Sequence, residues 1–379
     1  MDHYIWQLPF WPDFRRDDSA LLRPLGITRK TQGKLLAKSE HFGLGARADV
    51  LAQEAFTTAA IEGELLDRES VRSSVARRLG LPTAGLPPAN RHVDGLVEML
   101  VDATRNHKEP LTAERLQGWQ AALFPTGYSG MNKIVVGDWR RDTEPMQVVS
   151  GPIGKETVHY EAPPAKRVDL EVERFLAWFQ SPPDHMDGLV RAAVAHLWFV
   201  TIHPFDDGNG RIARAVTDMA LARDEDMDFR LYSMSAQIRT DQDKYYDILE
   251  QTQRGDGEIT EWIIWFLDCL SRAIHRSEAE IDKVMAKARF WSNIARITLN
   301  ERQRKAVNRL LEAGPGGFTG GLTNRKYRGM TKTTRETSKR DIGDLVAKGI
   351  LARRPGGGRS TSYDLNWELA TRSDPQSSG

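Results

Sequence analysis

Apolar residues return at helical spacing along most of this chain of 379 residues, and this periodicity restricts its fold more than any other feature. Between residues 19 and 79, positions such as Leu51, Ala55 and Ala59 follow one face of a helix, and only Pro24 interrupts the stretch. We therefore expect two or three helices there. Helical patterns also cover residues 91–125, 169–180, 189–200, 211–222, 242–253 and 259–288. The sequence thus predicts a mainly α fold.

Three stretches before residue 170 depart from this periodicity. The opening segment YIWQLPFWPD mixes aromatic residues with prolines, so we expect an irregular strip whose rings pack on a neighbour. The segment LPTAGLPPAN, residues 81–90, carries three prolines and predicts a linker, which is the first candidate domain boundary. The segment 131–164 has β-branched runs around Gly151, Pro152 and Gly154, and it predicts a β-hairpin.

The last part of the chain changes character. Residues 301–311 and 334–348 have helical patterns with a glycine-rich loop between them, and two short strands around a glycine turn follow. This order is the outline of a winged helix-turn-helix module. Residues 301–366 hold 15 Lys and Arg against 6 Asp and Glu, which is typical of contact with nucleic-acid phosphates. The candidate contacts are Lys339, Arg340, Arg353, Arg354 and Arg359. Winged modules also dock proteins, so the fold alone leaves both partners open.

Composition excludes several classes of protein. Lys and Arg number 53 against 52 Asp and Glu, so no overall charge directs the chain to nucleic acid or to a membrane surface. The single cysteine, Cys269, excludes an intramolecular disulfide and a multi-cysteine zinc site, which is typical of a reducing compartment. No run approaches the roughly 20 apolar residues of a membrane helix, and the first residues lack a signal-peptide pattern. We therefore expect a cytoplasmic protein with no membrane partner.

The segment HPFDDGNGRIAR, residues 203–214, combines the residue types that phosphate chemistry needs. The apolar pattern places a helix start near Gly210, so Gly208 and Gly210 lie where free N–H groups and the helix dipole favour an anion. Glycines there also let a phosphate approach the backbone closely. We expect Arg211 and Arg214 on the face opposite the apolar stripe, where they can bind phosphate oxygens through fork-like hydrogen bonds.

Two further side chains of this segment suit transfer chemistry. Asp207 is a hard oxygen ligand of the kind that Mg²⁺ uses when it also binds phosphates. His203 can accept a proton near neutral pH. Each feature alone has an ordinary structural explanation, such as a satisfied histidine, a glycine turn or solvated arginines. Twelve contiguous residues that meet all these needs together favour the functional explanation.

These residues match without departure the signature His-Pro-Phe-x-(Asp/Glu)-Gly-Asn-Gly-Arg-x-x-Arg, and the chain therefore resembles the Fic-domain family. The resemblance implies an all-α catalytic core that transfers AMP from Mg·ATP to a Ser, Thr or Tyr hydroxyl of a protein. It implies that His203 takes the hydroxyl proton and that Asp207 holds Mg²⁺. The other implied roles are phosphate contacts for Gly208, Asn209, Gly210 and Arg211, a γ-phosphate contact for Arg214, and a buried anchor for Phe205.

A second segment, TAAIEG at residues 58–63, lies on a predicted helix of about residues 50–66. A glycine inside a helix costs about 1 kcal/mol relative to alanine, so Gly63 indicates close packing. The helix alone favours a solvated Glu62. Beside the Fic signature, however, the segment resembles the inhibitory motif (Ser/Thr)-x-x-x-Glu-(Gly/Asn) of self-inhibited relatives. This implies that Thr58 and Glu62 are regulatory, and that Glu62 pairs with Arg214 in place of the γ-phosphate.

The resemblance extends with less specific signals over most of residues 1–290. It implies that the hairpin at residues 146–160 is the flap that holds a target by strand addition, with an ordinary structural hairpin as the alternative. Tyr245 and Tyr246 begin a helix where relatives place a tyrosine near the adenine. We favour Tyr246, although core packing explains either residue almost equally well.

The complete prediction is an all-α Fic core with a β-hairpin flap, an N-terminal helical domain and a winged helix-turn-helix. The expected domains are 1–85 with the inhibitory helix, 86–295 as the Fic core, 298–366 as the winged module, and 367–379 as a tail. We predict a self-inhibited protein adenylyltransferase that uses ATP and Mg²⁺ and modifies a protein hydroxyl, its own included. A homodimer and a DNA partner stay open. Two alternatives are a site that chiefly removes AMP and a DNA-binding regulator whose core senses nucleotide.

Overall fold

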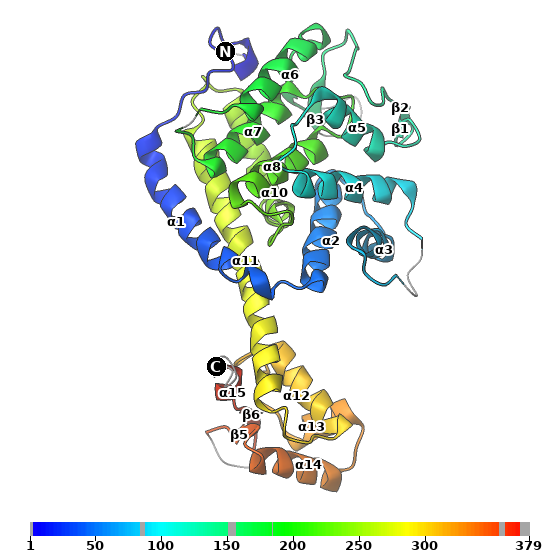
Figure 1. Cartoon of the computed structure of the whole chain (residues 1–379), viewed down its shortest axis with the longest axis vertical. Helices are drawn as coiled ribbons and strands as arrows, with labels where there is room; N and C mark the ends of the chain where they lie inside the picture. The colour runs from blue at the N-terminus through cyan, green and yellow to red at the C-terminus, as the bar shows by residue number, and fades with distance from the viewer. Residues whose placement is uncertain (1–2, 84–87, 151–156, 184, 356–360, 372–379) are drawn as a thin grey trace. The chain divides into compact units, whose positions relative to one another are not determined.

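The computed structural model describes residues 3–83, 88–150, 157–183, 185–355 and 361–371. It is mainly helical with two-stranded hairpins, as the periodicity predicts (Figure 1). The chain divides into two compact units, Met1–Ser277 and Glu278–Gly379. We call them unit 1 and unit 2. Within the described residues, no helix is long and apolar enough to cross a membrane.

Unit 1 begins with the predicted aromatic strip, which contains a short 3-10 helix, Ile5–Gln7. Its rings do pack on neighbours. The indole N–H of Trp6 donates to the Glu161 carbonyl (2.8 Å), and that of Trp11 donates to the buried Glu171 carboxylate (2.7 Å). Three helices follow, namely α1 (Asp18–Leu36), α2 (Leu44–Ile61) and α3 (Arg68–Leu79).

Helices α7 (Gly188–Ile202) and α8 (Asn209–Glu225) form the buried centre of unit 1. Every side chain of α7 from Ala192 to Ile202 is buried, as expected of a helix that is apolar on all sides. The surrounding helices are α4 (Arg91–Arg105), α5 (Ala113–Leu123), α6 (Ala165–Gln180), α9 (Met234–Thr240), α10 (Gln242–Gln253) and the part of α11 (Thr260–Asn293) that precedes residue 278. Helix α9 is absent from the sequence prediction because seven residues are too few to establish a period.

Two hairpins lie between α5 and α6. Strands β1 (Tyr128–Ser129) and β2 (Asn132–Lys133) pair first, and β3 (Gln147–Ser150) pairs antiparallel with β4 (Thr157–Glu161). The register runs from Gln147 opposite Glu161 to Ser150 opposite Thr157, with a shift between Val148 and Val149. The second hairpin is the one that the sequence predicts. Its turn residues Gly151, Pro152 and Gly154 lie outside the described residues, as do residues 84–87 of the predicted linker.

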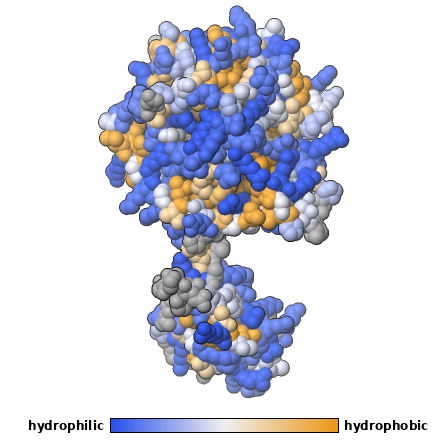
Figure 2. All heavy atoms as spheres, in the orientation of Figure 1, coloured by the Kyte–Doolittle hydropathy of each residue, from blue (hydrophilic) through white to orange (hydrophobic). Residues whose placement is uncertain are grey.

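Unit 2 contains α12 (Glu301–Ala313), α13 (Asn324–Thr331), α14 (Arg335–Ala347), the antiparallel pair β5 (Leu351–Arg353) and β6 (Tyr363–Leu365), and α15 (Glu368–Thr371). From α12 to β6, helices are followed by a hairpin, which agrees with the order that the sequence predicts. The sequence analysis missed α13, a short helix that Thr323 caps and the buried ring of Tyr327 holds in place. On α14, Lys339 and Arg340 are exposed, and Figure 2 shows hydrophilic side chains over much of the visible face of this unit. Arg359 lies outside the described residues.

Candidate active site

The segment from His203 to Arg214 forms the turn between α7 and α8 together with the first residues of α8. His203 has a left-handed backbone (φ 51°, ψ 59°) that ends α7. Gly208 precedes α8 with φ 90°, a conformation that residues with a Cβ rarely adopt. The Asn209 side chain closes the loop, because its amide donates to the Phe205 carbonyl (2.7 Å) and its oxygen accepts from the Phe205 N–H (2.9 Å). Phe205 is fully buried against Trp139, with 4.8 Å between ring centroids.

This turn faces a cavity of about 660 Å³. The other walls come from the end of α2, the β3–β4 hairpin and α10, so segments far apart in the sequence meet here. His203 lines the cavity, and its Nδ1 lies 3.2 Å from the Val200 carbonyl. That contact assigns the ring proton to Nδ1 and leaves Nε2 as a proton acceptor. Burial lowers the pKa of His203 to about 4, so the imidazole is neutral at pH 7.

The structure brings Arg214, Thr58 and Glu62 together. The guanidinium donates from Nη2 to Glu62 Oε1 (2.7 Å) and to the Thr58 carbonyl (2.9 Å), and from Nε to Thr58 Oγ1 (2.7 Å). Arg214 is 3% exposed and Arg211 is 4% exposed, so the face of α8 opposite the predicted apolar stripe is also buried. The reason is that α8 is packed on all sides, which a single apolar stripe does not indicate.

The segment of residues 58–63 also differs from its prediction. Helix α2 ends at Ile61, not near residue 66, and Gly63 has φ 79° just beyond it. The Gly63 N–H donates to the Ala60 carbonyl and the Glu64 N–H to the Ala59 carbonyl, which is a Schellman ending. Gly63 therefore ends the helix. The free-energy cost of a glycine inside a helix does not apply to it, and it is no sign of close packing. Glu62 then lies over the start of α8, where a Cβ added to Gly210 would be 2.2 Å from Glu62 Oε1.

Glu64 holds the other arginine of the turn, and the sequence analysis missed it. Its Oε2 lies 3.2 Å from Arg211 Nη1, and its Oε1 lies 2.6 Å from His92 Nε2. The Glu64 carboxylate raises the pKa of His92. Both arginines of the turn are thus paired with carboxylates from one three-residue segment. The sequence signal for Glu64 is its position two residues after Glu62. His92 gives no such signal, because it lies on a separate helix, α4.

Asp207 lies at the N-terminal end of α8 and is the residue that suits a metal. Its carboxylate accepts from the Ser129 hydroxyl and from the Gly208 N–H (2.5 Å), and 38% of the side chain is exposed. No group of three His, Cys, Asp or Glu side chains in the described parts of the chain could hold a metal ion. Asp207 would therefore be a single protein ligand. This fits Mg²⁺, which usually keeps waters and binds through one or two carboxylates and substrate phosphates.

The two tyrosines at the start of α10 have different surroundings. Tyr245 is 2% exposed, and its hydroxyl lies 2.8 Å from Nε2 of the buried His196. Tyr246 is 42% exposed, and its hydroxyl lies 3.4 Å from the Ile61 carbonyl at the end of α2. Both line the cavity. Tyr246 is therefore the more accessible of the two to a ligand in the cavity.

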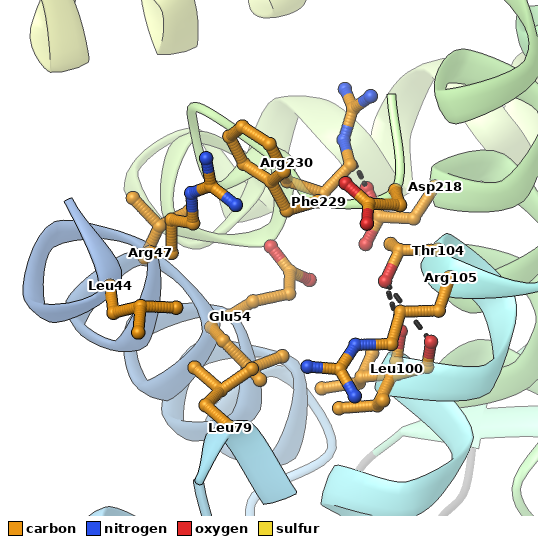
Figure 3. A pocket seen from close by; sticks show the side chains of 14 residues that line it. Leu44, Arg47, Glu54, Leu79, Leu100, Thr104, Arg105, Asp218, Phe229 and Arg230 are labelled. Carbon is orange, nitrogen blue, oxygen red and sulfur yellow. Dashed lines mark hydrogen bonds and ion pairs between the residues drawn. The ribbon is translucent and has the colours of Figure 1, made fainter. Parts of the chain in front are cut away.

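Helix α2 is fixed from the side away from the cavity. Its buried Glu54 accepts from the Ser233 hydroxyl (2.7 Å) and the Ser235 N–H (3.2 Å) at the start of α9. Figure 3 shows this carboxylate pointing into a small hollow of about 60 Å³, near the Arg47 side chain that covers the Phe229 ring at 3.5 Å. These contacts position the C-terminal end of α2, and with it Glu62, over α8.

Comparison with known proteins gives matches to two stretches of unit 1, residues 4–81 and residues 110–221. Residues 4–81 match the family model described as a domain of unknown function, DUF4172. A protein adenylyltransferase Fic of Culex quinquefasciatus is 33% identical over 108 residues, which are 28% of this chain and 20% of that protein. A uridine 5'-monophosphate transferase of Xanthomonas campestris is 29% identical over 120 residues, 30% of this chain and 21% of that protein. The match thus spans about a fifth of each relative's length.

A solved structure agrees in fold. The crystal structure of a Fic family protein from Desulfovibrio desulfuricans G20 has a TM-score of 0.52 and 17% identity, over 92% of this chain and 96% of that one. The model of the Fic/DOC family matches residues 110–221, which run from the start of α5 to within α8 and include the complete turn from His203 to Arg214. The chain therefore contains a Fic/DOC family domain at residues 110–221, and a DUF4172 domain at residues 4–81 precedes it.

Proposed function

We propose that this chain is a self-inhibited protein adenylyltransferase, which moves AMP from ATP to a hydroxyl of a protein. One observation supports the proposal most strongly. A neutral His203 and a helix N-terminus face a common cavity, while the chain's own Glu62 binds the arginine beside them at 2.7 Å. The first two features suit transfer to a hydroxyl, and the third suits control of that transfer.

The chemistry is a displacement at the α-phosphorus of ATP. The target hydroxyl gives its proton to Nε2 of His203, and its oxygen forms a bond to phosphorus. The bond from phosphorus to the bridging oxygen breaks, and pyrophosphate leaves with the electron pair. We propose that the first N–H groups of α8 and the Arg211 guanidinium, once Glu64 releases it, stabilise the negative charge that develops on the phosphate. Little else is required, because phosphoryl-type transfer depends mainly on positioning and charge neutralisation.

Mg²⁺ supplies charge neutralisation at the phosphates when it is bound, and Asp207 is the residue that would hold it. In an Asp207→Ala variant we expect the Mg²⁺ concentration for half-maximal transfer to rise about tenfold or more, because the single carboxylate ligand is gone. The measurement is a Mg²⁺ titration of AMP transfer. Asp169→Ala makes the same change at an exposed position on α6 and is the matched control. An unaltered titration for Asp207→Ala would show that Asp207 is not the ligand.

The resting enzyme is inhibited because Glu62 competes with a phosphate for Arg214. The same guanidinium cannot keep its short contact to the carboxylate and also bind the terminal phosphate in full. Because 31% of the Glu62 side chain is exposed, the carboxylate can return to water when it is displaced. We infer that residues 1–85 form the inhibitory part and that residues 86–295 form the catalytic part.

Glu64 adds a second point of competition at Arg211. We expect Glu64→Gln to increase the affinity for Mg·ATP about fivefold, which corresponds to loss of roughly 1 kcal/mol of competing charge pairing. Calorimetric titration with a non-hydrolysable ATP analogue measures this without any transfer. Glu69→Gln makes the same change at an exposed position on α3 and should leave the affinity as it is. Equal affinities for the two variants would contradict a role for Glu64.

The choice of ATP over UTP depends on the end of the cavity beside α10. Asp243 and Asp247 line the cavity next to Tyr246, and carboxylates accept hydrogen bonds from the exocyclic amine of adenine. The corresponding position of uracil is a carbonyl oxygen, which a carboxylate repels. The test supplies each α-³²P-labelled nucleotide to the protein with a cell lysate and follows labelled bands. Predominant labelling from UTP would reject the adenylyl assignment, and loss of label from a pre-modified target would indicate removal of AMP.

A further inference from the structure

A buried arginine that the proposed chemistry does not use lies beneath the turn that carries His203. Arg140 is 3% exposed and follows β2 in the chain. Its Nε donates to the His203 carbonyl (2.7 Å), and its Nη2 donates to the carbonyls of Pro163 and Ile202, the latter at 3.4 Å. Its backbone N–H donates to the Pro204 carbonyl (2.9 Å). One residue thus binds three successive carbonyls of the turn, at positions 202 to 204.

Arg140 differs from the other buried arginines of the described residues in the groups that surround its charge. Arg211, Arg214 and Arg230 each have a carboxylate within 4 Å. For Arg140 the described part of the chain places no carboxylate at that distance, and only carbonyl oxygens receive its hydrogen bonds. A buried charge with no carboxylate in contact is costly, so a guanidinium at this position needs an explanation beyond packing.

The end of α7 provides that explanation. The last carbonyls of a helix have no partner within the helix, and the negative end of its dipole favours a cation. Here the helix ends at a histidine with a left-handed backbone, a conformation that is unfavourable for a residue with a Cβ. A planar guanidinium can hold several carbonyls in a fixed geometry, whereas an ammonium group is a point charge. Arg140 therefore supplies what this turn needs to stay in its strained form.

We propose that Arg140 is a positioning residue for His203, which holds the carbonyls of residues 202 to 204 and thereby keeps the imidazole directed into the cavity. It acts through the backbone, because Arg140 does not itself line the cavity that contains His203. Its positive charge also lies close enough to disfavour an imidazolium at His203, in the same direction as burial. The effect on transfer rests on the proposed function, but the effect on the imidazole does not.

The experiment compares Arg140→Met, Arg140→Lys and the control Arg141→Met in the full-length chain. Arg141 is the next residue, and 74% of its side chain is exposed. Titration of ¹³C-histidine-labelled protein by NMR follows the His203 ring, with His203→Ala to assign its signal. We expect Arg140→Met to raise the pKa of His203 by about one unit, because a nearby positive charge is removed. Arg140→Lys should keep the low pKa, and Arg141→Met should change nothing.

Transfer kinetics in a Glu62→Gly background give the second readout. We expect kcat to fall about 100-fold in Arg140→Met and about tenfold in Arg140→Lys, because a small misplacement of the base is costly, while KM for ATP changes less than threefold. The acid limb of the pH profile should move upward only in Arg140→Met. An unchanged His203 titration together with an unchanged kcat would overturn the proposal. If Arg140→Met fails to fold, a wild-type kcat in Arg140→Lys would overturn the proposal. If no variant transfers AMP, the NMR titration of His203 alone tests the proposal.

Discussion

Replacement of His203 by alanine should reduce AMP transfer at least about 100-fold while nucleotide binding changes less than threefold. General-base catalysis contributes roughly 10²–10⁴-fold to a reaction rate. His203 lines the cavity, and its Nε2 is left as the proton acceptor. Its side chain is not among the groups that pair with Arg211 or Arg214, so phosphate binding should survive. The measurement is incorporation of labelled AMP, alongside calorimetric titration with an ATP analogue.

The comparison is cleanest in a Glu62→Gly background, where inhibition does not hide the loss. His185 is exposed and lies outside the cavity, so His185→Ala is the matched control and should transfer AMP at the parental rate. Strong residual transfer by the His203→Ala variant would show that another group takes the hydroxyl proton. A large loss of nucleotide affinity would instead assign His203 to binding.

Replacement of Glu62 by glycine should increase AMP transfer about 10- to 100-fold. The wild-type carboxylate occupies the Arg214 guanidinium at 2.7 Å, and a charge-assisted hydrogen bond of this kind is worth roughly 1.5–3 kcal/mol to a phosphate that gains it. The change should be tolerated structurally, because Glu62 is the cap residue after α2 and the helix ending is made by Gly63 and Glu64. Labelled-AMP incorporation into the protein itself or into lysate proteins measures the rate.

Two further variants separate release of inhibition from general loosening of the segment. Glu62→Gln keeps the size of the side chain and removes its charge, so it should activate nearly as well as glycine. Glu69→Gln should have no effect, because that residue is exposed on α3. An unchanged rate in both Glu62 variants would contradict inhibition by this contact. Combination with Glu64→Gln should activate further, since Arg211 is still held by Glu64 in the single variants.

Much of the fold could be read from the sequence, but short elements could not. The long helices have apolar periods that can be recognised in the sequence. The predicted ranges 189–200 and 211–222 nearly reach the observed bounds of α7 and α8. Helices α9 and α13 hold seven and eight residues, so their formation depends on caps at Ser233 and Thr323 and on tertiary packing. The end of α2 was predicted too late, because the glycine after Glu62 can be read as an interior or a terminal residue until its φ is known.

The sequence by itself determined the segment from His203 to Arg214, because twelve contiguous residues carry the whole set of proposed phosphate-binding groups in one local structure. It also indicated Glu62, although only through resemblance. The tertiary structure alone decided that both arginines are buried, that Glu64 and His92 join the inhibitory contact, and that Arg140 lies under the histidine. The physical reason is distance along the chain. These pairs are separated by 28 to about 150 positions, and no local period or propensity specifies which side chains meet across a packed core.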